Sequence, residues 1–194
     1  MNNTYVFLGD SLTYGYGVKS KDNWVNLLKN DLNMKIYNKG VNGNTTADML
    51  YRFTEDVINL SANKLFLMAG TNDLLSKRSI TSIINNIEIM VKEALESNIE
   101  VILGIPPDII SNDANKLFMK CDNYPYCEEN LPLLRNELIK LSKKYNLKYI
   151  DFYTITNLSK KKNSDIYLDG IHLNPNGQKI LFQEAKKVFI LGNA

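Results

Sequence analysis

The chain has 194 residues, of which 44% are hydrophobic and 10% aromatic, and its 23 basic residues nearly balance 21 acidic ones. This length and composition exclude a disordered chain and predict a single domain over residues 1–194. The formal net charge of +2 lacks the basic excess typical of nucleic-acid-binding domains, so we expect no nucleic-acid partner.

Short apolar runs alternate with longer amphipathic segments along the chain. The apolar runs predict strands at residues 5–8, 35–38, 65–68, 101–105 and 149–151. Apolar residues at helical spacing predict helices, which in chain order span residues 24–32, 45–58, 80–95, 131–145 and 175–189. This alternation is typical of βαβ units and predicts a parallel sheet in a three-layer α/β/α sandwich.

Two of the predicted helices begin at residues that favour helix starts. Thr45 followed three residues later by Asp48 forms a capping-box pattern. Asn174 before Pro175 is typical of an N-cap followed by proline at the first helical position.

Two stretches show no clear periodicity. Residues 108–130 are rich in Asn, Asp, Tyr and Pro, and we expect a long loop there, which is uncommon unless it is functional. Its Phe118, Met119, Tyr124 and Tyr126 could line a pocket or pack against the loop itself. The lysine-rich residues 160–162 are expected to form a solvated loop.

In open parallel sheets, ligands bind outside the carboxyl ends of the strands. Residues 9–12, Gly-Asp-Ser-Leu, follow the first strand, and residues 38–43 follow the second. Residues 70–73, Gly-Thr-Asn-Asp, follow the third, and residues 169–172, Asp-Gly-Ile-His, precede the last helix. Each segment alone has the composition of an ordinary turn, but together they predict a site at one edge of the sheet.

The only histidine of the chain, His172, lies three residues after Asp169. A carboxylate bonded to an imidazole fixes its tautomer, and a serine hydroxyl needs such a base to act as a nucleophile. Ser11, in the turn after the first strand, is the natural candidate. Taken singly, His172 is more often a loop residue and Ser11 a helix cap, so the prediction depends on their joint placement.

At these four segments the chain resembles the GDSL, or SGNH, hydrolase family. The family's sequence blocks correspond to residues 9–12, to Gly40 within 38–46, to residues 70–73 and to residues 169–172, in this order. The resemblance spans nearly the whole chain. It implies a flavodoxin-like five-stranded parallel sheet of order 2-1-3-4-5.

The resemblance also implies roles for single residues. Ser11 would be the nucleophile, His172 the general base and then acid, and Asp169 its orienting partner. The oxyanion hole would consist of the backbone N–H groups of Ser11 and Gly40 and the side-chain amide of Asn72. A glycine amide can approach a ligand closely, and an asparagine amide is a neutral donor for a developing oxyanion.

The function so implied is that of a serine carboxyl-ester hydrolase. It would cleave a small-molecule ester, namely a lipid, short-acyl or acetylated-sugar ester, through an acyl-enzyme, without metal or organic cofactor. Asp10 and Asp73 are interpreted as turn-anchoring carboxylates, and Arg52 is expected to pair with a carboxylate.

Two alternatives stay open. The same triad could transfer the acyl group to an alcohol or sugar acceptor instead of water. The chain could also be a non-catalytic flavodoxin-like module in which Ser11, Thr13, Gly15 and Gly17 cradle a phosphate, since Gly-rich turns after a first strand do so. That second alternative gives no role to Asp169 and His172.

The remaining expectations concern location and the cysteines. The N-terminus has no charged segment followed by an apolar one, and no apolar run is long enough to span a membrane. We therefore expect a cytoplasmic protein without stable membrane insertion. Cys121 and Cys127 are expected to be reduced thiols in a loop, although a local disulfide is possible, and they lack partners for a zinc site.

Overall fold

The computed structural model describes residues 4–162 and 165–191, and its five strands form one parallel sheet. The strand order is β2-β1-β3-β4-β5, as predicted. The strands are β1 (Thr4–Gly9), β2 (Lys35–Gly40), β3 (Lys64–Met68), β4 (Glu100–Ile105) and β5 (Lys148–Asp151). All five predicted strands are confirmed, with ends that shift by one or two residues.

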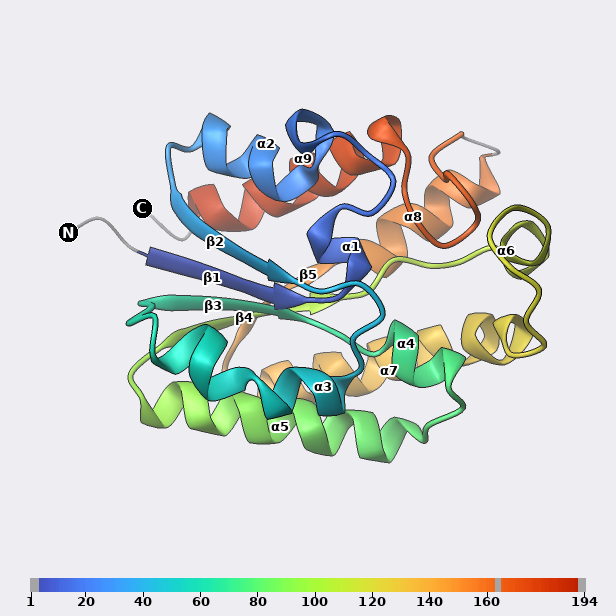
Figure 1. Ribbon diagram of the computed structural model, residues 1–194. Helices are drawn as coiled ribbons and strands as arrows, with labels where there is room; N and C mark the ends of the chain where they lie inside the picture. Colours follow the sequence, from blue (N-terminus) through green and yellow to red (C-terminus); the bar gives the residue numbers. More distant parts are fainter. Residues whose placement is uncertain (1–3, 163–164, 192–194) are drawn as a thin grey trace.

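Helices cover both faces of the sheet, which gives the predicted three layers (Figure 1). They are α1 (Ser11–Tyr14), α2 (Trp24–Asp31), α3 (Thr46–Tyr51), α4 (Thr71–Leu75), α5 (Ile80–Glu96), α6 (Ser111–Leu117), α7 (Tyr124–Lys144), α8 (Phe152–Lys161) and α9 (Pro175–Leu191). A 3₁₀ turn (Ser20–Asp22) precedes α2, and a π-helical turn (Thr54–Ile58) follows α3.

The core has two halves because successive strand residues point to opposite faces. In β1, Val6 and Leu8 pack under α3, α5 and α7, whereas Tyr5 and Phe7 pack under α2 and α9. All four side chains are buried, so β1 is apolar from Tyr5 to Leu8, as expected for a strand covered on both faces.

Both predicted helix starts are confirmed. The Asp48 carboxylate accepts from the Thr45 amide at 2.8 Å, and the Thr45 hydroxyl accepts from the Asp48 amide at 3.4 Å. The Asn174 side chain accepts from the amides of Asn176 and Gly177 at the start of α9. The helix predicted over 45–58 is divided, because α3 ends at Tyr51 before the π-helical turn.

The long loop predicted over residues 108–130 is wrong. It contains α6, and α7 begins at Tyr124. The buried stripe of α7 extends from Leu131 back to Cys127 and Tyr124, at spacings of four and seven residues. Pro125 stands in the first turn of α7, where a proline is tolerated. Both cysteines are free thiols, and Cys127 lies inside the helix rather than in a loop.

The solvated loop predicted at residues 160–162 is also wrong, because α8 runs to Lys161. The Lys160 ammonium group contacts the Asp108 carboxylate at 3.2 Å, the Ile109 carbonyl at 2.9 Å, and the Glu128 carboxylate. Asp108 is buried and Lys160 is partly buried, so this lysine pairs with a buried carboxylate and connects three segments. Within residues 4–162 and 165–191, no helix is long and apolar enough to cross a membrane.

The Gly104→Ala substitution is expected to lower the free energy of unfolding by about 1–3 kcal/mol, the usual cost of overpacking a core. A Cβ at Gly104 would lie 2.4 Å from Cζ of Phe66 and 2.8 Å from Cβ of Met68. Chemical denaturation measures the change, and Glu96→Ala on the exposed end of α5 serves as a control. Equal stability of Gly104→Ala and wild type would contradict this packing.

Candidate active site

Ser11 lies in the turn between β1 and α1. The Asp10 side chain caps this short helix by accepting from the Leu12 amide at 2.9 Å. The turn is tight at Gly9, where a Cβ would lie 2.1 Å from the Thr13 hydroxyl oxygen. Ser11 is 8% exposed and lines a cavity at the carboxyl end of the sheet.

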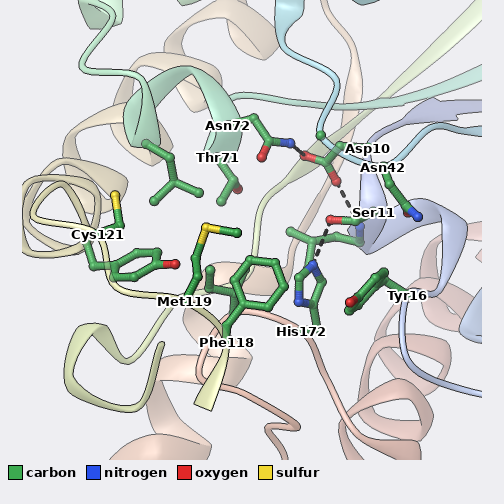
Figure 2. A pocket seen from close by; sticks show the side chains of 15 residues that line it. Asp10, Ser11, Tyr16, Asn42, Thr71, Asn72, Phe118, Met119, Cys121 and His172 are labelled. Atoms are coloured by element: carbon green, nitrogen blue, oxygen red, sulfur yellow. Dashed lines mark hydrogen bonds between the residues drawn. The ribbon is translucent and has the colours of Figure 1, made fainter. Parts of the chain in front are cut away.

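His172 joins Ser11 to Asp169. Its Nε2 lies 3.0 Å from Oγ of Ser11, and its Nδ1 lies 2.8 Å from Oδ2 of Asp169. Figure 2 shows the His172 imidazole pointing at the Ser11 hydroxyl, with both side chains at the wall of the cavity. The structure therefore brings together the three side chains that the sequence predicted, although 161 positions separate Ser11 from His172.

Hydrogen bonds within the segment 169–172 fix the Asp169 carboxylate next to His172. Oδ1 of Asp169 accepts from the amides of Ile171 and His172, at 3.0 and 2.8 Å. Burial would raise the pKa of Asp169, but the hydrogen bonds from His172 and Ile171 outweigh it and hold this pKa below its usual value of 3.8. The carboxylate is therefore ionised at neutral pH.

Gly170 fits this segment against the start of α6. Its φ of +89° is strained for other residues, and a Cβ there would lie 2.5 Å from the Ala114 amide nitrogen. The Gly170 carbonyl accepts from the Ile110 amide at 2.7 Å. The histidine segment and the chain after β4 therefore form one packed unit.

The position of Gly40 differs from the sequence expectation. Its amide donates to Oδ1 of Asn38 at 2.9 Å, and a Cβ at Gly40 would lie 2.3 Å from the Tyr14 amide nitrogen. Gly40 does not line the cavity. The sequence prediction that its N–H faces the reaction centre is therefore wrong: this glycine lets β2 pack against α1.

Gly43 lies at the cavity instead, and sequence reasoning missed it. Its φ is +79°, and no described atom lies within 4 Å of the place that a Cβ would take. Its amide makes no hydrogen bond to any residue in the described part of the chain. The signal available in the sequence was a second glycine three residues after Gly40.

Asn72 stands in the first turn of α4, close to Asp10 in Figure 2. Its side-chain nitrogen donates to the Asn44 carbonyl at 3.0 Å and to the Asp10 carboxylate at 3.3 Å. These two acceptors fix the amide group at the cavity edge, which Asn72 lines beside Ser11. Asn72 and Ser11 therefore line the same cavity, and the oxyanion role of Asn72 stays a prediction.

Carboxylates next to the site stabilise the surrounding turns. Burial raises the pKa of Asp10 to about 6. Asp73 is fully buried and accepts from the amide and hydroxyl of Thr46, at 2.8 and 2.7 Å. The expected carboxylate partner of Arg52 is Asp56. The Arg52 guanidinium also donates to the Gly9 and Lys39 carbonyls. Arg52 thereby ties the ends of β1 and β2 together.

The cavity has a volume of ≈ 300 Å³ and an apolar wall. Phe118, Met119 and Tyr124 line it together with Leu75 and Ile171. Of the two sequence interpretations of these three side chains, the pocket lining is therefore the one that the structure has. Tyr126 does not line it and packs against the core under α7. The cavity thus places apolar surface directly beside Ser11 and His172.

Two aromatic rings flank the imidazole. The ring centroids of Tyr16 and His172 lie 4.3 Å apart, and those of Phe118 and His172 lie 5.2 Å apart. Sequence reasoning did not identify Tyr16, whose only signal was its place between Gly15 and Gly17 shortly after Ser11. The rings restrict the plane of the imidazole and cover it from solvent.

The predicted phosphate cradle after β1 is not available. The amides of Thr13 and Tyr14 donate to the Asp10 carbonyl, and those of Gly15 and Tyr16 donate to the Ser11 carbonyl. Two of the four residues of the cradle, Thr13 and Gly15, therefore have no amide free for a phosphate. Nor do the described residues gather three His, Cys, Asp or Glu side chains that could hold a metal ion.

A model of the GDSL-like Lipase/Acylhydrolase family matches residues 7–180 of the chain. The uncharacterized lipoprotein YqeF of Bacillus subtilis (strain 168) is 41% identical over 75 residues. That match spans 35% of this chain and only 31% of the curated relative.

Two solved structures are similar over almost their whole length. A member of the lipolytic protein G-D-S-L family from Veillonella parvula DSM 2008 has a TM-score of 0.83 and 24% identity, and the match covers 96% of this chain and 98% of that chain. A catalytic mutant of an acetylxylan esterase from Geobacillus stearothermophilus has a TM-score of 0.79 and 18% identity, with 95% and 93% covered. These likenesses show the fold, and the family model spans most of the chain. The chain therefore belongs to the GDSL-like lipase/acylhydrolase family of ester-bond hydrolases.

Proposed function

We propose that this protein hydrolyses carboxyl esters through an acyl-enzyme intermediate formed on Ser11. The observation that carries the proposal is the unbroken hydrogen-bonded series from Asp169 through His172 to Ser11, with contacts of 2.8 and 3.0 Å. A serine hydroxyl is a poor nucleophile alone, and an imidazole at this distance can accept its proton.

Each proton transfer uses the same nitrogen. As Oγ of Ser11 attacks the ester carbonyl carbon, its proton moves to Nε2 of His172. The imidazolium donates this proton to the leaving alcohol when the ester C–O bond breaks. Water then attacks the acyl-serine and gives a proton to His172. The imidazolium returns this proton to Oγ of Ser11 as the acyl C–O bond breaks and the acid is released. The ionised Asp169 stabilises the imidazolium and fixes its tautomer.

The oxyanion that forms during each attack needs donors. We assign this role to the backbone N–H groups of Ser11 and Gly43 and to the side-chain amide of Asn72, with Gly43 in place of Gly40. The support is that Gly43 lines the cavity with an unused amide, whereas the Gly40 amide donates to Asn38. Both N–H groups of the Asn72 amide have acceptors in the free protein, Asn44 at 3.0 Å and Asp10 at the longer distance of 3.3 Å. The role therefore requires that the N–H bonded to Asp10 transfers to the oxyanion, while the bond to Asn44 keeps the amide in place.

The substrate is an ester with an acyl group that fits the apolar cavity beside Ser11. A volume of ≈ 300 Å³ is at the low end of ligand pockets. A short-acyl ester, the acyl end of a lipid and an acetylated sugar all meet this condition, and the similar Geobacillus protein is an acetylxylan esterase. The cytoplasmic location expected from the sequence stays a prediction, since the Bacillus relative is named a lipoprotein.

The Ser11→Ala variant is expected to lose at least about 10³-fold of the turnover of p-nitrophenyl esters, because the nucleophile is removed. A fluorophosphonate probe should label wild type at Ser11 and leave the variant unlabelled. Esters of increasing acyl length, assayed in parallel, measure the depth of the cavity.

The matched control for this serine is Ser97→Ala at the exposed end of α5, which should keep the wild-type rate. Turnover in Ser11→Ala equal to wild type, with normal folding by circular dichroism, would rule out the serine mechanism.

The Asn72→Ala variant should lower kcat by about 10²–10³-fold with little change in KM, as loss of one oxyanion donor does. Steady-state kinetics with p-nitrophenyl butyrate measures both constants. Asn59→Ala, at an exposed position after the π-helical turn, is the control. A change confined to KM would instead assign Asn72 to ground-state binding.

Asp10 gives a pH dependence of stability. Its pKa rises from 3.8 to about 6 on folding, so the native state binds its proton more tightly than the unfolded chain does. The free energy of unfolding should therefore fall as the pH rises from about 4 to about 6, by up to about 3 kcal/mol from this group. Urea unfolding of wild type and Asp10→Asn over this range measures the effect. The variant should lack this decline, and parallel pH curves for the two proteins would refute it.

A further inference from the structure

A short exposed segment stands at the mouth of the cavity. Residues 116–120 read Lys-Leu-Phe-Met-Lys, and we call them the tip. Leu117, Phe118 and Met119 are 66%, 37% and 56% exposed, and both flanking lysines are exposed as well. Three consecutive large apolar residues in contact with water are unusual on a surface and indicate a site of interaction.

The tip is continuous with the proposed reaction centre. It comprises the end of α6 and the first residues of the connection to α7, and α6 stands out beyond the carboxyl ends of the strands (Figure 1). Phe118 and Met119 belong to both the tip and the cavity wall, and Figure 2 shows them beside His172. The Tyr16 ring adds a further apolar surface, with its centroid 6.1 Å from that of Phe118. Whatever covers the tip therefore also covers the cavity mouth.

Hydrogen bonds hold the tip at both ends. At the start of α6, the Ser111 amide donates to the Glu128 carboxylate at 3.1 Å. After the tip, the Cys121 amide donates to the Asn115 side chain at 2.9 Å. Ala114, in the middle of α6, is fully buried. The exposure of the apolar side chains is therefore a property of a fixed segment.

The charges favour a lipid surface as the occupant. A lipid surface accepts a small apolar wedge, while lysines beside it extend to the headgroup phosphates. Lys116 and Lys120 form no salt bridge with any residue that the structure describes. Asp113 and Asp122 lie in the same stretch of chain, so apolar insertion must supply most of the affinity. A stable dimer would need ~800 Å² per partner, far more than three partly exposed side chains offer.

We propose that the tip docks this protein on an anionic phospholipid surface and that the cavity draws its acyl esters from that surface. The docking rests on the tip alone. The choice of lipid esters as substrate class rests on the function proposed above.

Co-sedimentation with vesicles of equimolar phosphatidylcholine and phosphatidylglycerol tests the docking. Wild type should bind, and Leu117→Ser should bind about tenfold more weakly, because one apolar side chain no longer enters the lipid. The matched control is Leu133→Ser, which is 53% exposed on α7 and should bind as wild type does. Absence of wild-type binding, or equal losses in both variants, would overturn the proposal.

The Ser11→Ala variant separates docking from catalysis. It should bind these vesicles as tightly as wild type while it hydrolyses nothing. If wild type binds vesicles but Ser11→Ala retains full activity, the serine mechanism fails and the docking stands.

Activity tests the second half of the proposal. With a long-chain acyl ester dispersed in the same vesicles, Leu117→Ser should turn over about tenfold more slowly than wild type, and with soluble p-nitrophenyl butyrate the two should be equal. If wild type and Leu117→Ser have equal rates on the vesicle-bound ester as well, the link to lipid esters is overturned.

Light scattering tests whether a second copy of the chain occupies the tip instead. A wild-type dimer that dissociates in Leu117→Ser would assign the tip to a dimer interface and overturn the proposal.

Discussion

The position of β1 between β2 and β3 is the constraint from which the site follows. β1 pairs with β2 on one side and with β3 on the other, in registers that set Gly9 opposite Gly40 and Leu8 opposite both Lys39 and Leu67. Because all three strands are parallel, their carboxyl ends meet at one edge of the sheet. Ser11 therefore lies between the segment after β2, which carries Gly43, and the first turn of α4, which carries Asn72. Arg52 reinforces the same edge by bonding carbonyls of β1 and β2.

The sequence was sufficient for the sheet and for much of the site because both depend on local signals. The inner strands β1, β3 and β4 are short apolar runs, as burial on both faces requires, whereas the edge strands β2 and β5 carry a weaker signal. The turns after β1 and β3 contain Ser11 and Asn72, and the sheet edge brings them together. The placement of His172 could be predicted because the chain has no second imidazole and because Asp169 precedes it by three residues. The bonds of 2.8 and 3.0 Å come from the structure alone.

Other features depend on contacts that no local pattern specifies. Gly40 ends β2 and Gly43 follows three residues later, and their surroundings distinguish them. The Gly40 amide donates to the Asn38 side chain, whereas Gly43 lines the cavity and its amide donates to no residue that the structure describes. The end of helix α8 was missed because Lys160 pairs with the buried Asp108 carboxylate, although residues 160–162 have the composition of a solvated loop. Helix α6 was missed because its one fully buried residue is Ala114, so its sequence lacks the periodic apolar residues that indicate a helix.

Gly170 has a consequence for how this protein can change. Its carbonyl accepts from Ile110, and its Cα packs on the backbone of α6, so the segment that carries His172 rests on the segment that leads to the cavity wall. Acyl-length preference and alignment of the base are therefore coupled traits rather than separate modules. A graft that exchanges residues 108–123 for a relative's longer or shorter wall would also exchange the support of the imidazole. Redesign of the pocket would have to preserve the Ile110–Gly170 contact while it changes the side chains beyond it.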